Sequence, residues 1–216
     1  MERQITNFIF DIDGTLIDTY NMYMPAMIEV MEKHGYHVPA NQVEPMKKKL
    51  FGITGADSLR QAGIRSEDIP EMVAEWGKLA FSREDQVKVF DGVVSTLKEL
   101  AARPDTHIAI ATSKNQDAYD HHFANVWDWS KWFDAVVTED QTNKHKPDPD
   151  PILLAMKKLG ASPESSVYVG DTINDLKAAH NAGIKCAGAL YGSSQPQNIA
   201  DADFPLHEPS DLLKID

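Results

Sequence analysis

Five short apolar runs, separated by segments long enough to form helices, constrain the fold of this chain more than any other feature. The runs span residues 5–10, 107–111, 135–138, 166–169 and 184–189. Several of them are apolar at nearly every position, as expected for strands that helices cover on both faces. Strands that alternate with helices along a chain form a parallel sheet. We therefore predict an α/β fold built on a parallel-sheet core.

Helix signals support this order and reveal one interruption. Residues 150–160 combine a capping aspartate, a proline at the first helical position, an apolar stripe and a terminal glycine. Residues 18–87, in contrast, contain several amphipathic helical patterns and no convincing strand. We interpret that stretch as an inserted helical subdomain. The expected domains are residues 1–15 with 88–216 for the sheet core and residues 16–87 for the insertion.

Composition narrows the class of function. The 216 residues carry 21 Lys and Arg against 33 Asp and Glu, and the resulting net charge of −12 argues against a general nucleic-acid binder. The single cysteine, Cys186, excludes a disulfide within the chain and fits a reducing compartment. No segment approaches the ~18 apolar residues of a membrane span. We expect a cytoplasmic protein that binds neither nucleic acid nor a membrane.

The first predicted strand runs directly into two acids, Asp11 and Asp13, which are followed by Gly14. Ligands of parallel α/β sheets bind beyond the carboxyl ends of the strands. Two residues apart in an extended chain, the acids can face the same way, and Gly14 permits a sharp turn. An EF-hand calcium loop is excluded, because Leu16 and Met22 stand where that loop needs glycine and glutamate.

Later strand ends carry further groups that suit a phosphate and a metal ion. Thr112 and Ser113 follow the second core strand, where a helix would begin, and this arrangement suits an anion. Lys146 lies among prolines after the third strand, and Asp171 and Asp175 follow the fourth. Carboxylates of this kind suit magnesium, a hard cation that proteins often hold together with substrate phosphate.

With these motifs in order, the chain resembles the haloacid dehalogenase-like phosphatases over essentially its whole length. The matching motifs are Asp11-x-Asp13-Gly14-Thr15-Leu16, Thr112, Lys146-Pro147-x-Pro149 and Gly170-Asp171-x-x-x-Asp175. Within that superfamily it is similar to the phosphoglycolate phosphatase and β-phosphoglucomutase branch, whose helical cap follows the first motif. The resemblance implies a Rossmann-like core, a helical cap, and hydrolysis of a small phosphate monoester, either phosphoglycolate-like or a sugar phosphate.

The resemblance and the chemistry together assign roles in catalysis. Asp11 attacks phosphorus and forms an aspartyl-phosphate, whereas Asp13 protonates the leaving oxygen and then activates water. Thr112, the backbone amide of Ser113, and Lys146 hold the phosphoryl oxygens.

Magnesium is the expected cofactor. Its ligands are the Asp11 carboxylate, the backbone carbonyl of Asp13, and Asp171. Asp175 supports this shell through Asp171 or water, and Gly14 supports the turn between the first two ligands.

Two other functions stay open on the sequence alone. A sugar phosphomutase similar to β-phosphoglucomutase would use the same chemistry, but mutases of that branch carry an arginine where this chain has Gly55. That departure favours hydrolysis. A catalytically silent binding protein on the same fold would lose the nucleophile or the metal acids, and this chain keeps them.

Overall fold

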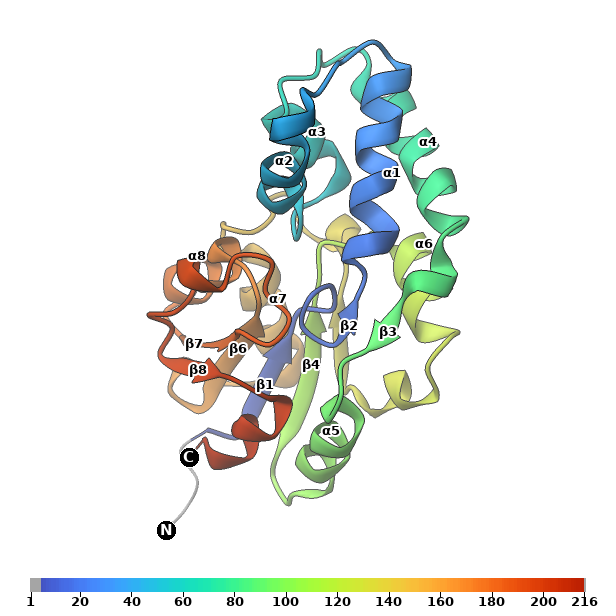
Figure 1. Ribbon diagram of the computed structural model, residues 1–216. Coiled ribbons are helices and arrows are strands. Elements are labelled where there is room, and N and C mark those ends of the chain that lie inside the picture. The colour runs from blue at the N-terminus through green and yellow to red at the C-terminus, as the bar shows by residue number, and fades with distance from the viewer. Residues whose placement is uncertain (1–4, 216) are drawn as a thin grey trace. The chain divides into compact units, whose positions relative to one another are not determined.

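The chain, described over residues 5–215 in a computed structural model, divides into two compact units (Figure 1). The sheet unit runs up to Ile17 and resumes at Val89, and the helical unit is Asp18–Lys88. The expected α/β class with a parallel-sheet core is confirmed.

The sheet unit is built on six strands in the order β5–β4–β1–β6–β7–β8, and every neighbouring pair is parallel. The strands are β1 (Asn7–Phe10), β4 (His107–Ala111), β5 (Ala135–Val137), β6 (Ser166–Gly170), β7 (Lys185–Ala189) and β8 (Phe204–Leu206). The five apolar runs correspond to the first five of these strands. The sequence analysis missed β8, an edge strand of three residues, because Pro205 at its centre argues against a strand.

The strand order explains how distant residues meet. In the register, Phe10 of β1 pairs with Ile110 of β4 on one side and with Val169 of β6 on the other. The segments that follow these three strands therefore emerge side by side at one edge of the sheet. The chain reverses its direction of winding at β1, which makes this edge the topological switch point where α/β proteins bind ligands.

Helices cover both faces of the sheet. They are α5 (Val93–Ala102), α6 (Gln116–Tyr119), α7 (Asp150–Leu159) and α8 (Ile173–Asn181). On one face α7 and α8 pack over Ile9, Tyr168 and Cys186, while α5 contacts β4. The N-cap of α7 is Pro149, and Asp150 is the first residue of the helix. The sequence analysis therefore placed this helix start one residue late.

Short 3₁₀ segments and one π turn connect these elements. The 3₁₀ segments are Ala40–Gln42, Glu84–Gln86, Asp128–Trp132, Glu139–Gln141, Pro163–Ser165, Pro196–Asn198 and Pro209–Lys214, and the π turn is Asp120–Ala124. Two further strands, β2 (Ile17–Asp18) and β3 (Lys88–Val89), form a separate two-stranded sheet.

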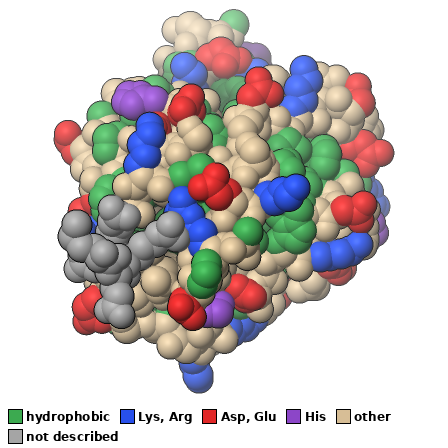
Figure 2. All heavy atoms as spheres, turned by 90° about the horizontal axis from the view of Figure 1, so that it is seen from below, with side chains coloured by type: hydrophobic (Ala, Val, Ile, Leu, Met, Phe, Trp, Pro, Cys, Tyr) green, Lys and Arg blue, Asp and Glu red, His purple; other side chains and the backbone are tan. Residues whose placement is uncertain are grey.

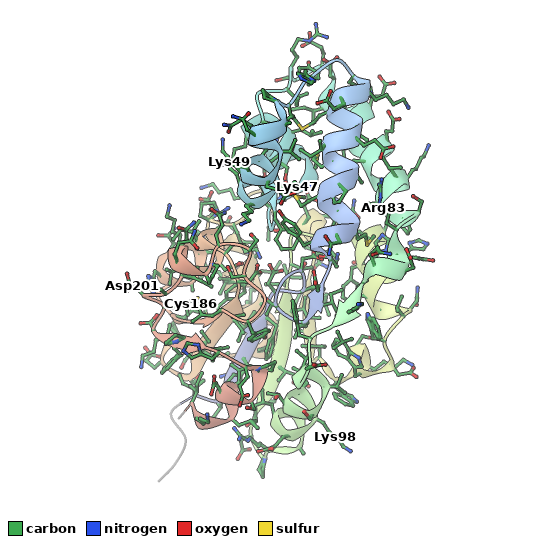
Figure 3. The ribbon with its side chains drawn as sticks, viewed as in Figure 1. Lys47, Lys49, Arg83, Lys98, Cys186 and Asp201 are labelled. Carbon is green, nitrogen blue, oxygen red and sulfur yellow. The ribbon has the colours of Figure 1, made fainter. Side chains whose placement is uncertain are left out.

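The helical unit is a bundle of α1 (Tyr20–Lys33), α2 (Val43–Leu50), α3 (Gly55–Gln61) and α4 (Ile69–Phe81). Its core is rich in flexible apolar side chains, including Met24, Met27, Leu50, Leu59 and Met72. Lys47 and Lys49 project from α2 (Figure 3), and Lys47 pairs with Glu44 one turn earlier.

The surface carries charges of both signs. On the face drawn in Figure 2, acidic and basic side chains are interspersed and form no continuous basic field. Within residues 5–215, none of the helices is both long and apolar enough to cross a membrane.

Candidate active site

Three buried acids converge beyond the ends of β1 and β6. Asp11 follows β1 and Asp171 follows β6, and the backbone N–H of Asp11 donates to the Val169 carbonyl at 2.9 Å. Asp175 joins them from the first turn of α8. All three side chains are buried, and each offers a carboxylate oxygen within 4.8 Å of the others. The strand order thus assembles acids that are far apart in the sequence.

Lys146 enters this acid cluster from the loop after β5. Its ammonium Nζ donates to Asp11 Oδ2 at 2.7 Å, to Asp175 Oδ1 at 2.7 Å and to the Tyr168 hydroxyl at 3.0 Å. A lysine ammonium has three N–H donors, so these acceptors use its full capacity. The predicted phosphate ligand therefore lies in contact with the predicted nucleophile.

Burial favours the protonated forms of Asp11 and Asp171. It raises the pKa of Asp11 to about 7, against the opposing effect of Lys146 and with a further rise from Asp175 and Asp13. Burial also raises the pKa of Asp171 well above its usual range, and the neighbouring Asp175 adds to the rise. A cation beside Asp11 and Asp171 would favour their ionised forms.

The donor set fits a divalent cation. Oδ2 of Asp171 is buried and has no hydrogen-bond partner among residues 5–215. Its other oxygen, Oδ1, accepts from the Thr15 hydroxyl at 3.3 Å. A buried carboxylate oxygen without a donor is costly unless a cation compensates it, and oxygen ligands suit magnesium or manganese.

Asp175 makes other bonds with both of its carboxylate oxygens. Oδ2 accepts from the Thr172 backbone N–H at 2.9 Å and from its hydroxyl at 2.6 Å, which forms a capping box at the start of α8. Oδ1 accepts from Lys146. Through these bonds Asp175 fixes both the Lys146 ammonium and the start of α8.

Gly14 allows the first acidic turn to approach Asp171. Its φ is +75°, in the left-handed region that favours glycine. A Cβ atom at this position would overlap the Asp171 carboxylate. The sequence analysis inferred the turn from Gly14, but only the structure shows that Asp171 fills the space of the missing side chain.

Asp13 meets a lysine that the sequence analysis did not single out. Lys114 Nζ lies 2.8 Å from Asp13 Oδ1, and the two side chains are only 2% and 13% exposed. The backbone N–H of Lys114 donates to the Thr112 hydroxyl at 3.3 Å, which orients this buried side chain. Ser113, between them, is half-buried. The helix after these residues starts only at Gln116, capped by the Asn115 side chain.

The loop that follows β7 contacts the turn after β1 and the turn after β6, which carry the acids of the site. The sequence analysis did not predict this loop as part of the site. The Tyr191 hydroxyl donates to the Thr15 carbonyl at 2.8 Å, and the Ser193 hydroxyl donates to the Asp171 carbonyl at 2.6 Å. A Cβ atom on Gly192 would overlap the Gly14 carbonyl. Glycine and serine are common in loops, so their contact with the site can be recognised only from the fold.

Comparisons with known proteins identify the family of this chain. A family model described as haloacid dehalogenase-like hydrolase matches residues 8–189, so the chain belongs to that family. The pyrophosphatase PpaX of Bacillus velezensis is 29% identical over 217 residues, which cover 99% of this chain and 97% of that protein. Phosphoglycolate phosphatase 1 of Pseudomonas aeruginosa is 28% identical over 200 residues, which cover 89% and 72%.

A solved structure shows the same fold at similar identity. A hydrolase from Pseudomonas syringae superposes with a TM-score of 0.82 at 28% identity, covering 97% of this chain and 96% of that one. The family match and these relatives confirm the resemblance inferred from the motifs. The chain is a haloacid dehalogenase-like hydrolase of the phosphatase type.

Proposed function

We propose that this enzyme is a magnesium-dependent phosphatase that transfers a phosphoryl group from a small molecule to Asp11 and then to water. The observation that carries the proposal is the ion pair between the buried Asp11 and Lys146, 2.7 Å apart, beside the uncompensated oxygen of Asp171. This arrangement provides a nucleophile, a cation for the phosphoryl oxygens and a place for a metal in one buried cluster.

In the first step, an oxygen of Asp11 attacks phosphorus and the bond from phosphorus to the leaving oxygen breaks. Asp13 gives a proton to that oxygen, so that the leaving group departs as an alcohol or an acid. Lys146, the Thr112 hydroxyl and the Ser113 backbone N–H would hold the equatorial oxygens, whose charge is stabilised in the transition state.

In the second step, water attacks the phosphorus of the aspartyl-phosphate. Asp13 takes the proton from that water, and the bond from phosphorus to Asp11 breaks to release inorganic phosphate. Asp13 thereby returns to its starting form. Lys146 remains beside Asp11 and stabilises the carboxylate as it leaves.

Asp11, Asp171 and the backbone carbonyl of Asp13 would hold the magnesium ion. When bound, it supplies positive charge that lets the anionic nucleophile approach an anionic phosphate.

Lys114 supports a particular class of substrate. Its buried ammonium contacts Asp13, which handles the leaving group in this mechanism. A buried lysine at that point favours a leaving group with its own negative charge, such as a second phosphate or a carboxylate. Pyrophosphate and phosphoglycolate both meet this description, and they are the substrates in the names of two relatives.

The helical unit would act as the cap that reads the leaving group, as in the branch that the sequence resembles. Within it, a Cβ atom at Gly55 would overlap the ring of Trp76, so the arginine expected of a mutase would require this ring to move. This observation supports a hydrolase over a phosphomutase.

The test is phosphate release from a panel of pyrophosphate, phosphoglycolate, hexose phosphates and nucleoside monophosphates, with magnesium or with a chelator. We expect release that needs magnesium, is lost in Asp11→Asn, and is fastest for pyrophosphate or phosphoglycolate. Asp201→Asn is the matched control, because Asp201 is an exposed loop residue (Figure 3). Equal release by wild type and Asp11→Asn would refute the mechanism.

The proposed substrate class has its own test. Lys114→Met should reduce turnover of pyrophosphate by about tenfold or more, because one charged hydrogen bond contributes about 1.5–3 kcal/mol. Turnover of p-nitrophenyl phosphate, whose leaving group lacks a second acidic group, should fall less. An equal loss on both substrates would show that Lys114 does not contact the leaving group.

A further inference from the structure

Tyr168 lies in the middle of β6 and is fully buried, yet neither the motifs nor the mechanism above uses it. Its partners in the register are Ile9 of β1 and Cys186 of β7, and all three pack beneath α7 and α8. Alternate residues of a strand face the same side. Asp11 therefore lies on the same side of the sheet as Ile9, and the Tyr168 ring, which is on that side too, extends toward the acid cluster.

The Tyr168 hydroxyl joins two parts of the site. It accepts from Lys146 Nζ at 3.0 Å and donates to the Ala111 carbonyl at 2.9 Å, while Asp175 Oδ1 lies farther away at 3.3 Å. A tyrosine hydroxyl has one proton to donate and lone pairs to accept with. Ala111 directly precedes Thr112, so these bonds connect Lys146 to the strand end that carries a second phosphate ligand.

Lys146 needs such a fixed contact. Its other two acceptors are the carboxylates of Asp11 and Asp175, each 2.7 Å from the ammonium, and the two compete for it. The lysine side chain is long and flexible, and the Tyr168 hydroxyl links it to the Ala111 carbonyl at the end of the rigid strand β4. A misplaced cation loses much of its effect on a transition state, because that effect depends on preorganised geometry.

We propose that Tyr168 is a positioning residue, whose hydroxyl fixes the Lys146 ammonium against Asp11 by linking it to the carbonyl of Ala111. The inference rests on the proposed function and adds to it a residue that acts through Lys146. A phenylalanine would fill nearly the same volume in the core without making this link.

The first experiment compares Tyr168→Phe with wild type under steady-state conditions with magnesium. We expect kcat to fall about tenfold and KM to stay within about twofold, because the ammonium acts mainly on charge in the transition state. Tyr119→Phe is the matched control, because Tyr119, the last residue of α6, is also buried in the sheet unit, but its ring contacts Phe123 of the π turn. It should leave both constants unchanged.

A double-mutant cycle separates positioning from general packing. In a Lys146→Ala background, measured by single turnover with p-nitrophenyl phosphate, Tyr168→Phe should change the rate by less than about twofold. The same tenfold loss in both backgrounds would mean that the hydroxyl acts only on the fold, and an unchanged kcat in the single variant would also overturn the proposal.

A spectroscopic measurement tests the link without catalysis. In metal-free wild type with ¹⁵N-labelled lysine, the ammonium of Lys146 should give a resonance protected from solvent exchange, assigned by its loss in Lys146→Arg. It should broaden or vanish in Tyr168→Phe. A wild type without this resonance would contradict the proposal even if Tyr168→Phe failed to fold. Absence of turnover in wild type would instead count against the proposed function.

Discussion

The two units of this enzyme bury different kinds of side chain. In the sheet unit, charged groups such as Asp11, Lys146 and Asp171 lie inside the protein at the strand ends. In the helical unit the core is apolar, and ion pairs such as Lys33 with Glu75 lie at the surface. The lysine side chains differ most clearly, because Lys146 is 2% exposed and Lys33 is 67% exposed.

This difference separates residues that stabilise the fold from residues that perform chemistry. Burying a charge costs free energy unless partners compensate it, whereas burying a methionine stabilises the fold. Burial of charge at the strand ends therefore lowers the stability of the sheet unit, whereas the apolar core of the helical unit carries no such penalty. Substitutions of charged residues at the strand ends should therefore reduce activity, whereas matched substitutions on the surface of the helical unit should leave activity and stability unchanged.

The largest expected effect comes from the nucleophile. Asp11→Asn should reduce magnesium-dependent turnover by more than about 10⁴-fold, because the amide cannot attack phosphorus. Circular dichroism and the melting temperature should stay close to wild type, since a neutral amide replaces a buried carboxylate. Asp85→Asn, an exposed position of the helical unit, serves as the control and should keep full turnover. Activity that survives Asp11→Asn would exclude the aspartyl-phosphate.

The second effect concerns the two lysines. Lys146→Met should lower kcat at least about 100-fold and the free energy of unfolding by about 3 kcal/mol, because it leaves Asp11 and Asp175 buried without their cation. Lys33→Met should leave both quantities unchanged, since its ion pair with Glu75 is exposed to solvent. Urea unfolding and steady-state kinetics measure the difference. Similar losses in the two variants would break the contrast between the units.

A smaller effect on stability and magnesium binding should distinguish two glycines whose backbones both adopt a positive φ. Gly14 and Gly63 have φ of +75° and +85°, but only at Gly14 would a Cβ atom meet a side chain, that of Asp171. Gly63→Ala should cost about 1–2 kcal/mol from backbone strain alone. Gly14→Ala should cost more and should also weaken magnesium binding, measured by calorimetry. Equal magnesium affinity in both variants would show that Gly14 serves only the turn.

The smallest effect is the pH dependence of metal binding. Because the pKa of Asp11 is raised to about 7, a proton competes with the metal below that value, and affinity for magnesium should increase about tenfold from pH 6 to pH 8. The same shift makes metal-free protein less stable as pH rises from about 4 to about 7, since the folded state holds the proton more tightly than the unfolded chain.

Asp11→Asn is the control for this pH dependence. It removes the titrating carboxylate, so its remaining affinity for magnesium should vary less with pH than that of wild type. An identical pH profile in both proteins would assign the dependence to another group, such as Asp171.

Several features of the fold and site could be predicted from local sequence. Continuous apolar runs identified five strands, since a strand buried on both faces needs apolar residues at every position. Acids directly after two of these runs pointed to the functional edge. In contrast, Lys114 and Tyr168 escaped notice, because a lone lysine in a loop and a tyrosine in a strand are ordinary residues there.

What the sequence by itself determined was five of the six strands of the main sheet and the chemistry available at their ends: an α/β core with acids, hydroxyls and a lysine after successive strands. Only the tertiary structure decided which of these groups touch. Lys146 and Asp11 are 135 positions apart, yet the strand order brings them within 2.7 Å. Periodicity reports local burial, whereas contacts between strand ends depend on the order and register of the sheet, and no local pattern encodes these.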